Sequence, residues 1–429
     1  MASPARPNAR PWMAGPGVGR MMKSRQGRQL NEKGSEDMFK QTTAITSMNL
    51  RSIPQRLGTS WVIVVGIAVT VAVLVSVLAM SQGFQKTLAN TGRQDRAIVL
   101  RGGSVAELSS TLSRENTLTI MDAPGVKKDA DGKPVASAEI VAVVAVPLKK
   151  TGTPANVTLR GVGPKGAVLR PEIHLIAGRM FEPAVRELIV GKSAVAQFKG
   201  LEVGGKVAFR DSEWTVVGEF ESNGDAHESE MMGDIETVLS AFRRNLFQSV
   251  TALLDSPESF TRFKDALTSD PTLSVDVKRE PEYYAEQSKQ LGKLLNFIAV
   301  FVGGFMGVGA IFGALNTMYS AVSARALEIA TLRAIGFGAG AVVVSVFVEA
   351  LLLSLLGAVI GSAIAWVMFN GNTGNTLGAN FTQVVFHLTV TPATVVSAIV
   401  FACFIGVLGG LFPAVRAARL PVAAALRAG

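Results

Sequence analysis

The sequence predicts a polytopic membrane protein with four transmembrane α-helices and a large α+β extracytoplasmic domain between helices 1 and 2. Three observations predict this fold class. Hydrophobic residues make up 48% of the 429 residues and charged residues only 17%, so the chain is more apolar and less charged than an average soluble domain. Four long apolar runs hold most of this excess. A stretch of about 200 residues between the first two runs is long enough to bury a core of its own.

The four apolar runs each reach the length of about 20 residues that a membrane-spanning helix needs. They are Trp61–Met80, Leu294–Ala324, Ala341–Met368 and Ala393–Phe412. Some sixty residues precede the first run, and the run is too long for the apolar part of a cleavable signal peptide. We therefore expect an uncleaved signal anchor at the first run.

The orientation follows from the cations in the short segments that flank the runs. These cations include Arg51 and Arg56 before the first run, Arg325 and Arg333 after the second, and Arg416, Arg419 and Arg427 after the fourth. The loop from Asn370 to Pro392, between the third and fourth runs, has neither Lys nor Arg. Because cytoplasmic loops carry the excess of Lys and Arg, we expect a multi-pass protein of the bacterial inner (cytoplasmic) membrane. Both termini are then cytoplasmic and the large domain is periplasmic.

The expected organisation has ten parts. They are a disordered basic cytoplasmic tail (1–47), an interfacial segment (48–59), helix 1 (60–82), the periplasmic α+β domain (83–290), helix 2 with a stalk (291–320), a cytoplasmic coupling loop (321–340), helix 3 (341–370), a short periplasmic loop (371–391), helix 4 (392–413) and a cytoplasmic tail (414–429). The first part is rich in Pro, Gly, Arg and Ser, which favours disorder. Ser47–Leu57 mixes apolar and cationic residues and is either an interfacial helix or a basic flank of the anchor.

The large domain alternates between strand-like and helix-like patterns. Strands are expected at Ala97–Arg101, Ile140–Leu148, Asn156–Val162, Glu187–Val190, Lys206–Arg210, Trp214–Phe220, Val250–Leu254 and Leu273–Lys278. Helices are expected at Val105–Leu112, Ser193–Phe198, Asp234–Arg243 and Pro257–Thr268. The strands on either side of Asp211–Ser212 predict a hairpin. Pro281 suits a first helical turn, and the helix that it opens is expected to continue into the second span.

Two glycine-rich segments resemble nucleotide-binding motifs without meeting their requirements. Gly161–Gly166 has dinucleotide-type spacing, but Pro164 lies inside it, and that motif has to open a helix. Gly200–Val207 approaches a P-loop, but its last position is Val instead of Ser or Thr, and Lys206 begins a predicted strand. We expect turns at both places.

The sequence predicts no catalytic site, no metal site and no nucleic-acid binding. Cys403 is the single cysteine, so no intrachain disulfide or cysteine-based metal cluster can form. The basic residues are not interleaved with stacking aromatics. One acidic segment also carries a histidine: Asp225, His227, Glu228 and Glu230. We expect a solvated loop there, with metal binding as the alternative.

Small residues recur at helical spacing within the runs. The pairs are Gly303/Gly307, Gly309/Gly313, Gly357/Gly361 and Gly406/Gly410. Such pairs let helices approach closely, which predicts tight helix contacts and leaves open a dimer seam. Glu349 is the ionisable residue well inside a run. Because such groups face the interior of a bundle, we expect it to pair with a residue at the cytoplasmic side such as Arg333.

The loop after the second run predicts a short amphipathic helix. Arg325 and Glu328 are three residues apart, and Ile329, Leu332 and Ile335 can share one face. Gly336 is a typical helix stop. This helix is either a docking surface or a loop that merely reverses the chain.

At this point the chain resembles the MacB/FtsX-type permeases of ABC transporters. The resemblance rests on Glu328–Gly336 (EIATLRAIG), Phe347–Leu351 with Gly357–Gly361, and Phe412–Pro421 followed by Ala425–Arg427. Gly178–Phe181, Glu187–Gly191 and Trp214–Gly218 in the large domain are also similar. The resemblance covers nearly all of residues 48–427.

The resemblance implies a non-catalytic permease subunit that works by mechanotransmission. The cytoplasmic helix would contact a separate ABC ATPase subunit, which would bind the ATP and Mg²⁺, whereas this chain would bind no cofactor. It implies a homo- or heterodimer with a second permease in contact with membrane lipids, and it leaves a periplasmic adaptor open. The alternative is a membrane-anchored extracytoplasmic sensor or adhesion protein without an ATPase.

Overall fold

The computed structural model describes residues 41–48, 57–378 and 382–422. The chain forms two compact units. The first unit takes the described residues of Met1–Val71, Gly304–Gly361 and Ser397–Gly429, and the second takes those of Ala72–Gly303 and Ser362–Val396. Four helices in the described part are long and apolar enough to cross a membrane. Together with the large α/β domain in the second unit, they confirm the predicted fold class.

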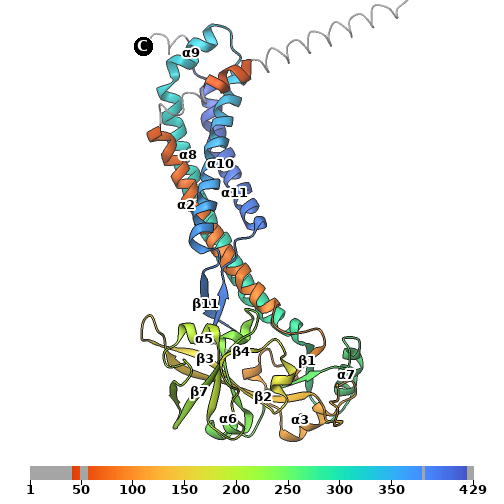
Figure 1. The fold of residues 1–429 in the computed structure, drawn as a ribbon. Coiled ribbons are helices and arrows are strands. Elements are labelled where there is room, and N and C mark those ends of the chain that lie inside the picture. Colours follow the sequence, from red (N-terminus) through yellow and green to blue (C-terminus); the bar gives the residue numbers. More distant parts are fainter. Residues whose placement is uncertain (1–40, 49–56, 379–381, 423–429) are drawn as a thin grey trace, which may run out of the picture. The chain divides into compact units, whose positions relative to one another are not determined.

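The long helices follow the predicted apolar runs but extend beyond some of them (Figure 1). They are α2 (Leu57–Ala89), α8 (Glu280–Ala324), α10 (Ala339–Phe369) and α11 (Pro392–Ala418). At 1.5 Å per residue, α2 is about 50 Å long and α8 about 68 Å, and both exceed the hydrocarbon thickness of about 30 Å. The prediction that one helix runs unbroken from Pro281 into the second span is confirmed, because α8 contains both.

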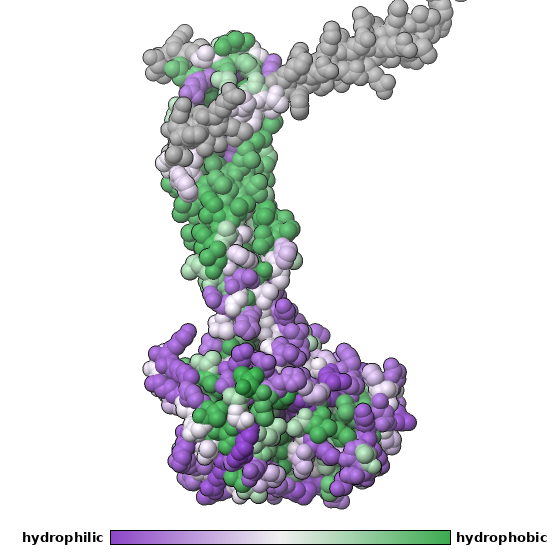
Figure 2. Space-filling view, viewed as in Figure 1, coloured by the Kyte–Doolittle hydropathy of each residue, from purple (hydrophilic) through white to green (hydrophobic). Residues whose placement is uncertain are grey.

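The first unit is entirely helical in its described part. Besides segments of the four long helices it contains α9 (Ala326–Ala334) and a helix over residues 41–48. Large apolar side chains such as Phe305, Phe312 and Phe404 are exposed, and Figure 2 shows a hydrophobic surface over these helices. This surface matches the environment that lipid provides.

The second unit is built on one mixed sheet of ten strands. They are β1 (Arg96–Arg101), β2 (Ala136–Pro147), β3 (Pro154–Val162), β4 (His174–Gly178), β5 (Glu187–Gly191), β6 (Lys206–Phe209), β7 (Ser212–Glu221), β8 (Glu230–Asp234), β9 (Ser249–Leu253) and β10 (Val275–Arg279). The order is β10-β1-β9-β2-β3-β8-β5-β7-β4, with β6 paired to β7. The pairs β3–β8 and β5–β7 are parallel and the others are antiparallel.

Short helices cover the sheet and close the main core. They are η2 (Glu107–Ser109), α3 (Arg114–Met121), α4 (Gly166–Leu169), α5 (Lys192–Gln197), η3 (Ala226–Ser229), α6 (Ile235–Ala241) and α7 (Ser259–Thr268). Inward-facing side chains of β2 and β3, such as Ile140 and Leu159, join Trp214 and Phe263 in this core. The alternation of buried and exposed residues along β7 is the period-two pattern of a half-buried strand.

The predicted elements of the large domain are mostly present, but one predicted helix is shorter than expected and some strands and helices were not predicted. The hairpin at Asp211–Ser212 is confirmed as β6–β7. The predicted helix Val105–Leu112 shortens to the single turn η2, and α3 follows it. The strands β4 and β8 were not predicted, because β8 reads Glu-Met-Met-Gly-Asp and acidic residues and Gly are poor strand formers.

Residues 371–391, predicted as a short periplasmic loop, contain two paired strands. Strands β11 (Thr373–Leu377) and β12 (Gln383–His387) pair in antiparallel register. One face of the hairpin puts Phe386 against Phe84 of α2, with their ring centroids 5.7 Å apart. This apolar contact explains why so short a hairpin is held in the second unit.

The predicted N-terminal tail and interfacial segment lie mostly outside the described residues. Residues 41–48, placed by the prediction almost wholly in a disordered tail, form a helix. Its Ile45 is only 2% exposed. The burial of this side chain supplies the apolar contact that composition alone did not predict.

Candidate functional sites

The short helix α9 lies between the second and third spans, as the sequence predicted. It ends in a Schellman motif: Gly336 has a φ of +106°, its N–H donates to the Arg333 carbonyl, and the Phe337 N–H donates to the Leu332 carbonyl. A left-handed Gly at this position satisfies the last carbonyls of a helix. Gly336 therefore fixes where α9 stops.

The first end of α9 is held by a buried ion pair. Arg325, the residue that precedes the helix, donates from Nη1 and Nη2 to the two carboxylate oxygens of Glu349 at 2.9 and 3.0 Å. The two residues are 6% and 4% exposed. Two parallel bonds fix both distance and direction, so the start of α9 is tied to α10. Glu349 therefore pairs with Arg325 and not with the predicted Arg333.

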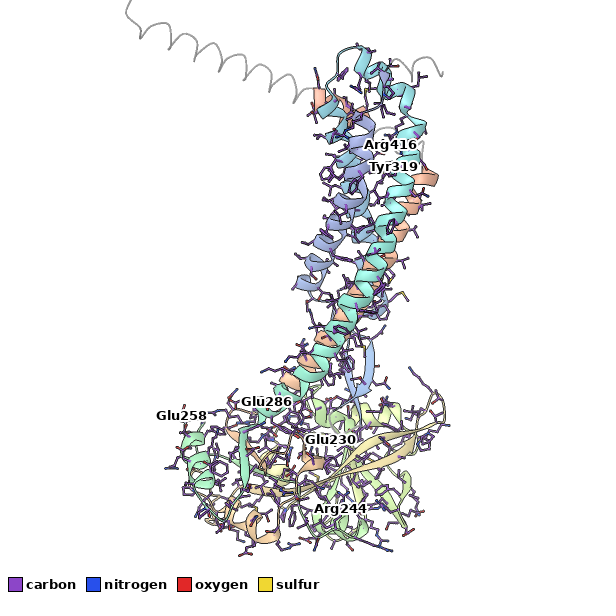
Figure 3. All side chains as sticks on the ribbon, turned by 180° about the vertical axis from the view of Figure 1, so that it is seen from behind. Glu230, Arg244, Glu258, Glu286, Tyr319 and Arg416 are labelled. Atoms are coloured by element: carbon purple, nitrogen blue, oxygen red, sulfur yellow. The ribbon has the colours of Figure 1, made fainter. Side chains whose placement is uncertain are left out.

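Arg333 takes a different role at the other end of α9. Its Nη1 donates to the Leu420 carbonyl at 2.8 Å, just beyond the end of α11. Arg333 lies eight positions after Arg325, which is about two helical turns. Nearby, Arg416 of α11 lies over the ring of Tyr319 of α8 at 5.3 Å (Figure 3). Both ends of α9 are thus connected to helices that span the membrane.

The helix over residues 41–48 also packs beside α9. Ile45 lines a small cavity together with Ile329, Leu332 and Val346. The Gln41 side chain accepts a hydrogen bond from the Gly338 N–H at 3.2 Å. The N-terminal helix therefore contacts the segment that connects α9 to α10.

The predicted apolar face of α9 is only partly buried. Ile329 is buried and Leu332 half-buried, but Ile335 is 72% exposed because it caps the helix and leaves its face. Leu327 is also 48% exposed. Glu328 lines the same cavity as Ile45. One side of α9 thus packs in the first unit, while another presents Leu327 and Ile335.

The predicted glycine pairs fall into two groups. A Cβ on Gly357 or Gly361 would lie 2.9 or 2.4 Å from backbone oxygens of α2, and one on Gly307 would lie 2.8 Å from the Phe401 ring. Gly303 faces Leu74 at 3.1 Å. Gly406 and Gly410 pack against Ser354 and Ala350 of α10. By contrast, a Cβ on Gly309 or Gly313 would meet no described atom within 4 Å.

A second candidate site is a cluster of buried ion pairs inside the large domain, which the sequence did not predict. At its centre, Arg160 of β3 donates to three carboxylates at distances of 2.7 to 3.0 Å: Glu107, Glu139 and Glu230 (Figure 3 labels Glu230). Arg170 makes two further bonds to Glu139 at 2.7 and 2.9 Å. These groups come from five separate segments of the chain, so the cluster fixes their relative positions.

The cluster continues to the start of α8 and the end of α2. Arg96, at the start of β1, donates to Glu280, the first residue of α8, at 2.5 Å and also pairs with Glu172. The Tyr283 hydroxyl accepts from the Glu107 N–H at 3.1 Å. Thr91, just past the end of α2, accepts from the Ala226 N–H at 3.0 Å. The ends of both helices are therefore held by the polar interior of the large domain.

Neighbouring charges keep the cluster ionised in spite of its burial. Burial alone would raise the pKa of Glu230, but Arg160 and His227 outweigh it and hold that pKa far below the ordinary value. Burial would lower the pKa of His227, but Glu230 and Asp225 raise it overall. Burial raises the pKa of Asp225 itself to about 6. Buried charges of this kind are tolerated only when they are paired and hydrogen-bonded.

The prediction of a solvated loop at the acidic segment was wrong. Asp225, His227, Glu228 and Glu230 are all buried. The His227 ring packs edge-on against Tyr284 of α8, and the Glu228 carboxylate accepts from the Ser222 and Gly224 N–H groups. Within the described part of the chain, no group of three or more His, Cys, Asp or Glu side chains is arranged to hold a metal ion.

A sequence signal for this cluster did exist. Glu139 and Arg160 are the single charged residues of their strands, which are otherwise uncharged and mainly apolar. Arg160 lies opposite Val141, two residues from Glu139 on the same strand face. Diagonal neighbours across antiparallel strands can pair, but strand register is needed to recognise this, and sequence alone does not provide it.

Two family models match the chain. The model described as MacB-like periplasmic core domain matches residues 60–270, and the one described as FtsX-like permease C-terminal matches residues 300–422. The first match contains strands β1 to β9 and the ion pairs of Arg160 and Arg170, and the second contains α9 and the Arg325–Glu349 pair.

Individual relatives agree with these matches. The macrolide export ATP-binding/permease protein MacB 2 of Yersinia pestis is 31% identical over 130 residues, which are 30% of this chain and 17% of that protein. The ABC transporter permease YknZ of Bacillus subtilis is 23% identical over 209 residues, 46% of this chain and 49% of that protein. The chain thus matches half or less of the length of these relatives.

Among solved structures, the periplasmic region of MacB from Actinobacillus actinomycetemcomitans is similar at 12% identity with a TM-score of 0.33. The similarity covers 47% of this chain and 92% of that one. The extracellular domain of YknZ from Gram-positive bacteria gives 16% identity and a TM-score of 0.33, over 43% and 99% of the two chains. On the two domain matches and the agreement of the relatives, this chain belongs to the MacB/FtsX-type permeases of ABC transporters.

Proposed function

We propose that this chain is a permease subunit that couples ATP hydrolysis on a separate ATPase chain to movement of its large domain. The observation that carries the proposal is the anchoring of α9 at both ends, by Arg325–Glu349 and by Arg333–Leu420. Leu327 and Ile335 remain exposed on the same short helix. Exposed apolar side chains on a helix suit a docking surface for a protein partner.

The anchors give a physical route for the coupling. A displacement of α9 changes the position of α10, because the Arg325–Glu349 pair is bidentate and buried and yields little. The same displacement acts on the end of α11 through the Arg333 bond to Leu420. At the other end of the chain's long helices, the buried ion pairs of Arg96 with Glu280 hold the large domain to α8. The continuous α8 contains both regions.

The orientation belongs to the proposal. The cations of the segments next to α9 and α11 favour the cytoplasm for α9 and both termini, which is where an ATPase would find ATP. The large domain would then be outside the cytoplasm, as would a periplasmic adaptor. The ATP and Mg²⁺ would be bound by the ATPase chain, with this chain non-catalytic and paired with a second permease. The resulting movement would serve efflux, the handling of lipids or lipoproteins, or regulation of an envelope enzyme.

Affinity purification of the tagged full chain from its native membranes tests the proposal. We expect an ABC ATPase to copurify and to hydrolyse ATP, and we expect Leu327→Glu with Ile335→Glu to remove it. Leu118→Glu is the matched control, because Leu118 is a 57% exposed leucine on α3 of the large domain. It should leave the ATPase in place.

Two results would contradict the proposal. In one, no ATPase copurifies with the folded chain, as expected for a sensor or adhesion protein. In the other, the ATPase is retained by the Leu327/Ile335 double variant and ATP turnover is unchanged.

A further inference from the structure

The second unit contains a cleft that none of the contacts above uses. Its volume is about 690 Å³, within the range of ligand sites of roughly 300 to 1,000 Å³. Four segments form its walls: the β2–β3 turn with Leu148 and Lys150, α5 with Lys192, the stretch from Glu221 at the end of β7 to Glu228 of η3, and the β11–β12 hairpin. All four belong to the second unit.

One face of the β11–β12 hairpin packs on the core, and the other lines this cleft. Val384 and Phe386 point to the apolar cluster of Phe84 and Tyr284. Side chains of the alternate residues line the cleft instead: Thr373, Asn375, Val385 and His387. Because strand side chains alternate between faces, the core contact of one face sets the polar face toward the cleft.

The edge of β11 has backbone groups that the hairpin does not use. The narrow, hydrogen-bonded pairs of the hairpin include Asn372 with Leu388 and Gly378 with Thr382. Alternation along an antiparallel ladder then makes Thr373 and Asn375 non-hydrogen-bonded positions. On the partner strand, the Val385 N–H points out of the hairpin and donates to Ser229 at 2.9 Å.

The opposite edge is thus occupied, whereas β11 pairs only with β12 among the described strands. The N–H and C=O groups of Thr373 and Asn375 therefore point outward along an open edge. An open edge of this kind is a template for one more strand.

The charges at the cleft favour an acidic group in the occupant. The Glu228 carboxylate already accepts from the Ser222 and Gly224 N–H groups at 2.9 and 2.8 Å. Lys192 faces Glu221 at 3.4 Å. For Lys150, the described residues offer no carboxylate within ion-pair distance. Lys150 is exposed to solvent, so an acidic side chain beside it would gain a weak, solvent-screened attraction.

We propose that the cleft binds an extended polypeptide segment that adds a strand to the open edge of β11 and places an acidic side chain near Lys150. Backbone bonds to Thr373 and Asn375 would give such a segment its affinity, and alternate side chains would enter the cleft. The site needs no ATPase, so it can be tested on this chain alone, and its failure would leave the proposed coupling function untouched.

The experiment measures binding of a labelled heptapeptide of alternating Val and Thr with a central Asp to the full chain in lipid nanodiscs. Two isomers carry N-methyl groups on either the odd or the even residues. In strand addition only one set of peptide amides faces β11. We expect one isomer to bind like the parent peptide and the other to lose binding. The proposal would be overturned if the parent peptide did not bind. It would also be overturned if both N-methylated isomers bound equally, because a ligand held like a small molecule or a lipid does not use the backbone amides that face β11.

Three substitutions at two positions refine the result. Asn375→Pro removes an outward N–H without touching the narrow pairs of the hairpin, and we expect about tenfold weaker binding. Asn375→Ala keeps that N–H and is expected to bind normally. Lys150→Gln should weaken binding about twofold to fivefold for the Asp peptide but not for its Asn analogue. Equal affinities of the Asn375→Pro and Asn375→Ala variants would contradict edge pairing.

Discussion

Arg325 and Glu349 form a bidentate ion pair at 2.9 and 3.0 Å, 24 residues apart in the chain and almost completely buried. The pair connects the point where the chain leaves α8 with the third turn of α10. A buried pair of this geometry adds little net stability compared with apolar side chains, but the loss of one partner leaves a buried charge alone. It therefore specifies a position more than it contributes to stability.

Removal of one partner should be costly. Glu349→Gln or Arg325→Gln should each reduce the stability of the chain by about 3 kcal/mol, measured as the thermal unfolding midpoint in detergent. The exchange Arg325→Glu with Glu349→Arg should recover part of the loss, because it restores opposite charges. If Glu349→Gln kept full stability but abolished function, Glu349 would have a chemical role instead of a positioning one.

The glycines of the spans should respond according to their surroundings. Gly361→Val should prevent folding of the first unit, since its Cβ would lie 2.4 Å from the Ala68 carbonyl oxygen. Gly309→Ala and Gly313→Ala meet open space and should leave stability unchanged or raise it by about 1 kcal/mol through helix propensity.

Yield and unfolding midpoint in detergent measure both effects on the glycines. A loss of stability in Gly309→Ala or Gly313→Ala would show that another molecule packs against that surface. If Gly309→Leu kept the fold but lost the dimer, the surface around Gly309 would be the contact between two copies of the chain.

Two arginines of the large domain, one buried and one exposed, allow a comparison of buried and exposed ion pairs. Arg160→Met leaves Glu107, Glu139 and Glu230 without their shared partner and should cost about 3 to 5 kcal/mol. Arg114 pairs with Glu236, with both side chains more than half exposed, and Arg114→Met should cost about 1 kcal/mol or less. Hydrogen exchange of the β2–β3 amides in the full chain measures both. Equal effects would mean that the buried cluster is not structurally important.

The sequence predicted the elements with strong periodicity and missed those fixed by distant partners. The four spans, the Gly336 stop of α9 and the β6–β7 hairpin follow from local composition and turn residues. The pairing of Glu349 with Arg325 depends on the path of the chain between α8 and α9. The hairpin at 373–387 depends on Phe386 finding Phe84, some 300 residues earlier. The cluster around Arg160 depends on strand register, which no local pattern encodes.

The stability of the large domain should depend on pH through Asp225. Burial raises the pKa of this carboxyl to about 6 from an ordinary value near 3.8, so the folded domain binds a proton more tightly than the unfolded chain. The cost of its buried charge is then present above pH 6 and is relieved as the pH falls toward 4. The pKa of His227 is also raised, so His227 acts in the same direction. Its contribution to the stability of the folded domain is complete below the ordinary pKa of 6.5 and is lost at higher pH.

Opposing groups set the acid side of this profile. The pKa values of Glu139 and Glu230 are lowered, as burial is outweighed by Arg170 and Arg160. Their contribution is present above an ordinary value of 4.5 and is lost as the pH falls below it. Stability should therefore rise from pH 8 to about pH 5 and fall below about pH 4.5.

Asp225→Asn should flatten the rise between pH 8 and pH 5 and gain about 1 kcal/mol at pH 7.5. The amide oxygen of Asn can still accept a hydrogen bond from the backbone N–H of His227, as the Asp225 carboxylate does at 2.9 Å. The control Asp270→Asn should leave this slope unchanged. Hydrogen bonds to Thr272 lower the pKa of Asp270, so this carboxyl titrates at more acidic pH. Unfolding midpoints of the full chain, followed by tryptophan fluorescence to which the buried Trp214 contributes as one of four tryptophans, measure both variants. A slope that survives Asp225→Asn intact would assign the upper part of the profile to His227 alone.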